Sequence, residues 1–210
     1  MQVTHLSTAA WVRTPRFIAL IALIATTSAN AKEGEFVDPR DGKSYATVKI
    51  GAATWFAQHL NFDAPSSHCY DDDPANCAGL GRLYPWEVAL AACPPGWHLS
   101  TDLDWQLLEF ELGMPVDALE EIETRGGNEG AKMEAGGGSG LELARAGYRN
   151  PDGSYERKGE VAVLWTSTEA DSKNAWHRDI GGGRRESWRS REYKPYGMSV
   201  RCVKNTFEPK

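Results

Sequence analysis

Residues 81–109 read GRLYPWEVALAACPPGWHLSTDLDWQLLE, and this stretch decides much of the fold. Trp86, Leu90 and Cys93 are spaced i, i+4 and i+7 along it, which predicts that they share one face of a helix. The Pro-Pro-Gly triplet at 94–96 ends that helix, because neither residue type continues a helical backbone well. The stretch therefore predicts a first helix that carries a cysteine in its last turn.

A second helix is expected after the short apolar segment Trp97-His98-Leu99. Thr101 and Asp104 have the spacing of a capping box, which satisfies free backbone amides at the start of a helix. The helix carries a broad apolar stripe that we expect to face the core, made of Leu103, Trp105, Leu107, Leu108 and Leu112. Gly113 and Pro115 then end the helix.

Outside this stretch the chain has the pattern of short strands separated by turn residues. Residues 44–50 are rich in β-formers, Gly51 interrupts them, and residues 54–56 resume the pattern, which predicts a hairpin. Residues 61–82 are expected to form a loop, since proline, serine and glycine recur in them. Further strands are expected at 145–149, 161–166, 174–180, 186–193 and 198–203. The predicted fold class is α+β in one domain, with two helices plus antiparallel sheets and long loops.

The N-terminus has the pattern of an export signal. Arg13 and Arg16 precede an apolar run at 17–25, and Ala29-Asn30-Ala31 offers a cleavage site of small residues. The apolar run is shorter than the ~20 residues that cross a bilayer as a helix. We therefore expect residues 1–31 to be a signal peptide cleaved after Ala31, with no membrane span left once it is removed.

The remaining chain divides into a polar lead-in at 32–40, a folded domain at 41–204 and a tail at 205–210. Loss of the two leader arginines lowers the formal charge from −6 to −8. So acidic a protein has no global attraction to nucleic acid, and no nucleic-acid partner is expected. The expected location is secreted or periplasmic, and the sequence indicates no oligomeric state.

All four cysteines, Cys69, Cys77, Cys93 and Cys202, follow the leader. An even number in an exported chain favours two disulfides, and three pairings are compatible with the sequence. We expect Cys69–Cys77, which flank a short loop, and Cys93–Cys202, which would join a helix end to the last strand. A metal site on His68 with the first two cysteines is the alternative, but its spacing matches no standard zinc motif.

Several stretches together resemble one known family. They are DGKSYATVKIGAATWFAQHLN (41–61), GRLYPWEVALAACPPGWHLSTDLDWQLLE (81–109), AGYRNPDGSY (146–155), LWTSTEADSKNAWHRDI (164–180) and YGMSVRCVK (196–204). In this order they resemble the Fibrobacter succinogenes major paralogous domain, a family of exported bacterial domains, over nearly all of the chain after the leader. The resemblance implies a C-type-lectin-like fold and a role at or beyond the cell envelope, without a defined ligand.

The loop between the first two cysteines is a candidate cation site. Asp71, Asp72, Asp73 and Asn76 supply oxygen ligands of the kind that calcium prefers. The glycine-centred loop of an EF-hand is absent, and so are the sugar-binding calcium motifs of C-type lectins. The alternative is a solvated loop under a small disulfide, so the expected cofactor is none, with calcium as the one candidate.

Residues 173–204 contrast with the acidic remainder of the chain, because they hold nine Lys/Arg and three Asp/Glu with aromatic residues between them. Along a strand, Arg189, Arg191 and Tyr193 would share one face. Aromatic rings stack on sugars, and arginine forks bind carboxylates or sulfates. The candidate ligand-binding residues are Trp176, Arg178, Trp188, Arg189, Arg191 and Tyr193. The alternative is structural, with the aromatics in the core and the arginines paired to acidic residues of the same chain.

No enzyme motif stands out in the chain. Formylglycine-generating enzymes resemble this family in fold and use a C-terminal cysteine pair, whereas only Cys202 lies in the last third here. Carboxylate pairs such as Glu109 and Glu111 are expected on solvated helix faces, which argues against a glycan-processing enzyme. We expect an exported, non-catalytic binding module that recognises a glycan or an envelope or extracellular protein. The alternative is a structural or adhesion component of the envelope or of an appendage.

Overall fold

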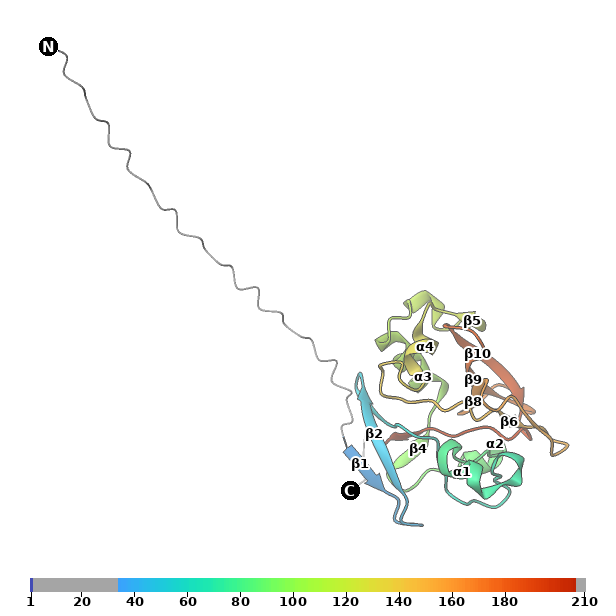
Figure 1. Ribbon diagram of the computed structural model, residues 1–210. Coiled ribbons are helices and arrows are strands. Elements are labelled where there is room, and N and C mark those ends of the chain that lie inside the picture. The colour runs from blue at the N-terminus through green and yellow to red at the C-terminus, as the bar shows by residue number, and fades with distance from the viewer. Residues whose placement is uncertain (2–33, 207–210) are drawn as a thin grey trace.

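The computed structural model describes residue 1 and residues 34–206 (Figure 1). The expected signal peptide and its cleavage site at Ala31 lie outside the described residues, as does most of the tail.

The two ends of the described domain meet in a five-stranded sheet in which each neighbouring pair is antiparallel. Its order is β1 (Gly34–Val37), β2 (Ser44–Ile50), β3 (Ala53–Phe56), β11 (Cys202–Lys204) and β4 (Trp97–Leu99). The expected hairpin is confirmed as β2 and β3. The last strand lies between the hairpin and β4, so the two ends of the domain are held together in one sheet (Figure 1). Strand β1 falls within the segment expected as a lead-in and pairs with β2.

A second antiparallel sheet carries the basic and aromatic region. Its order is β5 (Glu123–Arg125), β10 (Ser187–Tyr193), β9 (Asn174–Gly181) and β8 (Val161–Glu169). The other edge of β8 is bridged by Ser199, whose amide donates to the carbonyl of Val163. A small hairpin completes the strands, formed by β6 (Tyr148–Arg149) and β7 (Tyr155–Glu156).

The described residues contain four α-helices rather than the two expected. They are α1 (Pro74–Leu80), α2 (Trp86–Ala89), α3 (Asp102–Glu111) and α4 (Glu129–Met133), with short 3₁₀ turns η1 (Tyr70–Asp72) and η2 (Val116–Ala118). Helix α1 lies in the segment 61–82 that was expected to be loop. It forms there because the Asp73 side chain accepts from the Ala75 amide while Pro74 occupies the first turn.

Helix α3 begins at the expected capping box, but only part of the predicted apolar stripe faces the core: Trp105 and Leu108 are buried and Leu112 packs against the core. The Thr101 and Asp104 side chains cap each other's backbone amides. The residues that α3 buries are Asp102, Trp105, Leu108 and Glu109, whereas Leu103 and Leu107 are exposed. The prediction that these two leucines face the core is therefore wrong, and so is the placement of Glu109 on a solvated face. Both errors have one physical cause, which is a set of buried arginines that this helix must neutralise.

The core between the sheets and helices is built on large aromatic side chains. Trp55, Trp105 and Trp165 are completely buried, and two apolar clusters form around them. Trp86, Trp97, Trp105 and Trp165 are all buried.

Both expected disulfides are present. Cys69 and Cys77 have a Cα separation of 5.1 Å, and Cys93 and Cys202 one of 5.8 Å, within the usual range for a bridge. The second links the turn after α2 to β11 across 109 positions, so it closes a long loop and restricts the unfolded chain. The α+β class with antiparallel sheets and two disulfides is confirmed. Among residues 34–206, no helix is long and apolar enough to cross a membrane.

Candidate functional site

Strands β9 and β10 bring five of the six candidate ligand-binding residues to one face of their sheet. Arg189 lies opposite Arg178 and Arg191 lies opposite Trp176, and Tyr193 follows on the same face of β10 by alternation. Trp188 points to the other face, where the Arg184 guanidinium lies 4.7 Å from the centre of its ring. Trp188 is therefore separated from the other candidates by the sheet itself.

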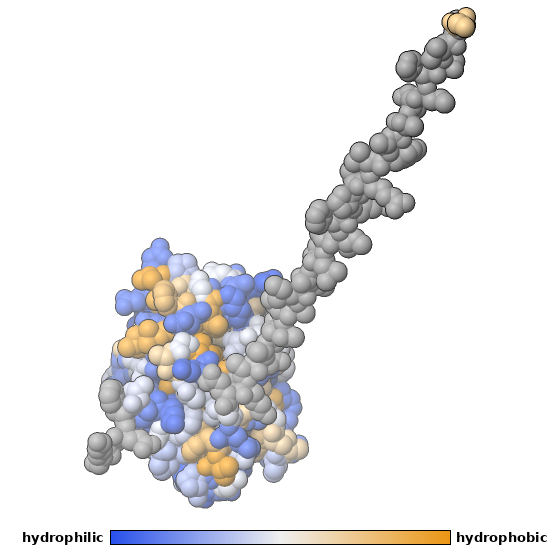
Figure 2. Space-filling view, turned by 90° about the vertical axis from the view of Figure 1, so that its left-hand side faces the viewer, coloured by the Kyte–Doolittle hydropathy of each residue, from blue (hydrophilic) through white to orange (hydrophobic). Residues whose placement is uncertain are grey.

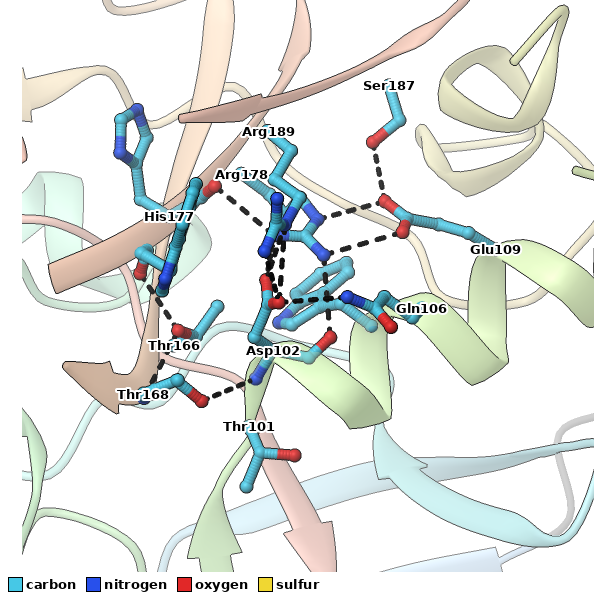
Figure 3. Close-up of polar contacts among 12 residues, drawn as sticks. Thr101, Asp102, Gln106, Glu109, Thr166, Thr168, His177, Arg178, Ser187 and Arg189 are labelled. Atoms are coloured by element: carbon cyan, nitrogen blue, oxygen red, sulfur yellow. Dashed lines mark hydrogen bonds and ion pairs between the residues drawn. The ribbon is translucent and has the colours of Figure 1, made fainter. Parts of the chain in front are cut away.

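Two of these residues are part of the interior. Arg178 is 0% exposed, and its Nη1 donates to Asp102 Oδ1 at 2.7 Å while its Nε donates to Glu109 Oε1 at 3.0 Å. Arg189 donates two hydrogen bonds to the same aspartate, from Nε to Oδ1 at 3.0 Å and from Nη2 to Oδ2 at 2.8 Å (Figure 3). Assigning Arg178 and Arg189 to a ligand surface was therefore wrong, because both guanidinium groups are already bound within the chain.

A third arginine completes this cluster, which we call the inner network: Asp102, Glu109, Arg125, Arg178 and Arg189. Arg125 is buried beside Glu109, and its Nη2 donates to Oε2 of that carboxylate. The Ser187 hydroxyl donates to Oε1 of Glu109 at 2.6 Å (Figure 3). Three arginines thus share two carboxylates, and backbone carbonyls such as that of Glu120 accept some of the remaining N–H groups.

The inner network keeps Asp102 ionised. Burial opposes ionisation, but hydrogen bonds and charges from Arg189 and Arg178 outweigh it and hold the pKa of Asp102 below its ordinary value. Burial lowers the pKa of Arg125 to about 10 against the attraction of Glu109. An aspartate held in this state orients arginines and has no proton to give at neutral pH.

The rest of the face is open to solvent. Together with Lys173, which lies just before β9, it forms a surface that we call the outer patch: Lys173, Trp176, Arg191 and Tyr193. Trp176 is half-buried, with the Arg189 guanidinium 3.7 Å from the centre of its ring. Arg191 is exposed, and within residues 34–206 its side chain has no ion pair or hydrogen bond. Tyr193 is 45% exposed. The sheet therefore presents the Trp176 ring, packed on Arg189, beside the exposed Arg191. The pKa of the nearby Asp171 is lowered by hydrogen bonds from Asn174 and Lys173 and by the charge of Arg191.

A shallow hollow adjoins the outer patch at the end of β10. It has a volume of about 420 Å³ and is lined by Pro85, Glu87, Ser172, Lys173, Tyr193, Lys194 and Pro195. Lys194 is turned inward, where its ammonium contacts Glu169 and lies 4.4 Å from the centre of the Trp86 ring. Lys173 and Tyr193 belong to both the hollow and the patch, so the two form one continuous surface.

The aspartates of the first disulfide loop already have donors. Asp72 Oδ1 lies 2.9 Å from His68 Nδ1 and accepts from the Tyr155 hydroxyl at 2.7 Å. The Lys158 ammonium lies 3.8 Å from Asp71 Oδ2 and donates to Asn76 Oδ1 at 3.3 Å. Asp73 caps α1. In the part of the chain that the structure describes, no group of three His, Cys, Asp or Glu side chains is arranged to hold a metal ion.

A buried arginine next to the last strand escaped the sequence reasoning. Arg201, directly before β11, is completely buried and hydrogen bonded to the carbonyls of Leu141 and Glu142. Its Nη1 donates to the carbonyls of Phe56 and Leu141, each at 2.7 Å, and its Nε donates to His59 Nδ1 at 3.1 Å. Burial and the nearby cation lower the pKa of His59 to about 3, so this imidazole is a neutral acceptor.

These observations define the class: an α+β domain stapled by two disulfides, with an ion-paired interior beneath an open aromatic and basic patch. The chain belongs to the family of the Fibrobacter succinogenes major domain, whose model matches residues 27–204. No curated protein and no solved structure matches it, so the C-type-lectin-like fold stays a prediction.

Proposed function

We propose that this chain is an exported, non-catalytic binding module that recognises an acidic glycan through the outer patch. One observation carries the proposal. Trp176 packs against Arg189, which is itself bound by Asp102, while Arg191 on the neighbouring strand is exposed and has no ion pair or hydrogen bond of its side chain within residues 34–206.

The chemistry of the patch favours sugars that carry carboxylate or sulfate groups. An indole face packs against the apolar face of a pyranose ring, and a guanidinium fork forms two hydrogen bonds with a carboxylate or sulfate. Trp176 and Arg191 stand directly opposite each other across β9 and β10, so one sugar unit can meet both. The adjoining hollow, with Lys173 and Tyr193 in its wall, offers room for the next unit of an extended chain.

The inner network supports a binding role rather than a catalytic one. A carboxylic acid that protonates a glycosidic oxygen needs a raised pKa, whereas the pKa of Asp102 is lowered by its arginines. Its contribution is to hold Arg189, and through Arg189 the Trp176 ring, in place before any ligand arrives. Such preorganisation reduces the entropy that binding would otherwise cost.

Export is supported by the leader pattern at residues 1–31 and by the two disulfides, which persist in oxidising compartments. Intact mass of the protein from its native host tests this directly. A chain that begins at Lys32 agrees with cleavage after Ala31, and a chain that retains residues 17–25 contradicts it.

The glycan proposal is tested by titrating the exported chain with uronate-rich, sulfated and neutral polysaccharides, with and without calcium. We expect binding to the acidic polymers, falling as salt rises because exposed charges are screened over ~10 Å at 0.1 M. Arg191→Ala should lose the interaction, whereas Arg185→Ala, a matched control at an exposed arginine in the β9–β10 turn, should keep it. Equal affinity for neutral polymers, or equal loss in both variants, would overturn the proposal.

A further inference from the structure

Helix α3 presents an apolar stripe to solvent. Leu103, Leu107 and Phe110 are 61%, 54% and 47% exposed, and their spacing of i, i+4 and i+7 puts them on one face. Single exposed apolar side chains are normal, but three in line along one helix face are not explained by chance exposure.

The folding of the domain does not require these side chains. The face of α3 that packs inward holds Asp102, Trp105 and Glu109, which neutralise and cover the inner network. The outward face contributes nothing to that interior, so glutamine or lysine at its three apolar positions would serve the fold equally well. The outward apolar stripe is therefore a feature that folding leaves unexplained.

Two further exposed apolar side chains follow α3 in the chain. Val116 in η2 and Ile122 just before β5 are also exposed. Figure 2 shows apolar side chains gathered in the upper part of the molecule, the part where Figure 1 draws α3 and the chain around it. We call this surface the α3 surface: Leu103, Leu107, Phe110, Val116 and Ile122.

The α3 surface is bordered by negative charge. Between positions 111 and 123 the chain has five acidic residues and no Lys or Arg. All five are exposed: Glu111, Asp117, Glu120, Glu121 and Glu123. Lys132 reaches the end of α3, but its ammonium is hydrogen bonded to the carbonyl of Leu112. An apolar stripe with an acidic border complements a segment that is apolar on one side and basic at its flanks.

We infer that the α3 surface docks a basic amphipathic helix of a partner protein, with the partner's apolar side on α3 and its lysines or arginines over the acidic border. This site goes beyond the proposed glycan site, since it uses a different element and an opposite charge. The module then has two faces, one for an acidic glycan and one that attaches it to a basic protein segment.

The inference is tested with a synthetic Leu/Lys peptide that forms an amphipathic helix, and with a Leu/Glu peptide of the same apolar face. Titration of the ¹⁵N-labelled chain with the Leu/Lys peptide should shift amide resonances in α3 and in 111–123. The Leu/Glu peptide should cause no shift. A double variant, Leu103→Gln with Leu107→Gln, should bind about a hundredfold more weakly, because each leucine buried in a complex contributes roughly a factor of ten.

Two controls separate docking from other causes. Leu90→Gln changes an exposed leucine at the end of α2 and should keep full affinity, and all variants should keep the wild-type unfolding midpoint. Glu120→Gln with Glu121→Gln should weaken binding and reduce its salt dependence. Shifts spread over the whole chain, equal binding of both peptides, self-association that buries α3, or binding to phosphatidylcholine vesicles in place of the peptide would each overturn the inference.

Discussion

Arg189 and Arg191 stand two residues apart on one face of one strand, yet they belong to different parts of the molecule. Arg189 is buried and bound to Asp102 by two nitrogens, whereas Arg191 is exposed and has no partner within residues 34–206. The difference arises because α3 begins at Asp102, whose carboxylate binds the Arg189 guanidinium and makes no hydrogen bond or ion pair with Arg191 (Figure 3). Whether an arginine is paired inside the protein or exposed for a ligand depends on which element packs against it. Local composition does not show this.

The largest effect on stability should follow from removing Asp102, the aspartate at the centre of the inner network. Asp102→Ala removes a carboxylate that neutralises the buried positive charges of Arg178 and Arg189, and breaking such a buried ion pair costs about 3–5 kcal/mol. Urea unfolding should show this loss in the free energy of unfolding. Asp117→Ala, at an exposed aspartate outside the network, should change it by less than ~0.5 kcal/mol. Equal effects of the two variants would mean that the inner network is not structural.

The dependence of stability on acid pH should next distinguish the inner network from the outer patch. The pKa of Asp102 is lower in the folded chain than its unfolded value of about 3.9. Its contribution is therefore complete above that unfolded value and is lost as pH falls through the folded pKa. The stability difference between wild type and Asp102→Asn should shrink as the pH is lowered from 6 to 2, to about the size of an uncharged substitution. A difference that is constant with pH would contradict an ionised Asp102.

A smaller effect on stability, with a clear effect on binding, is expected at Trp176, where the outer patch contacts the inner network. Trp176→Leu removes the half-buried ring that rests on Arg189 and should cost about 1 kcal/mol of stability. The same change should weaken binding of the acidic polysaccharide about tenfold, because the stacking surface is gone. Trp188→Leu, on the opposite face of the sheet, should leave binding unchanged. Loss of binding in both variants would place the site elsewhere.

The elements set by local rules could be predicted from the sequence. The first strand of the hairpin matched residues 44–50, the capping box located the start of α3, and the Cys93–Cys202 bridge was predicted. Each of these depends on neighbouring residues or on a pairing with few alternatives. The helix expected to carry Cys93 in its last turn is shorter, because α2 ends at Ala89 and Cys93 lies in the turn after it.

The orientation of α3 could not be predicted in this way. The predicted stripe grouped Leu103 and Leu107 with Trp105 and Leu108, whereas the buried face holds Asp102, Trp105, Leu108 and Glu109. The choice is made by Arg178 and Arg189, which lie 76 and 87 positions from Asp102 along the chain. A carboxylate at each end of one helix stripe, together with an excess of arginines in later strands, is the one signal that could have indicated the outcome.

One paired measurement tests the division into an inner network and an outer patch most directly. Arg189→Ala and Arg191→Ala are compared for the free energy of unfolding and for affinity to a uronate-rich polysaccharide. We predict that Arg189→Ala lowers the free energy of unfolding by about 3 kcal/mol, since it breaks a buried ion pair. Arg191→Ala should change stability by less than ~0.5 kcal/mol and lose the polysaccharide. If Arg191→Ala unfolds the domain, or if it binds the polysaccharide as the wild type does, the division into an inner network and an outer patch is wrong.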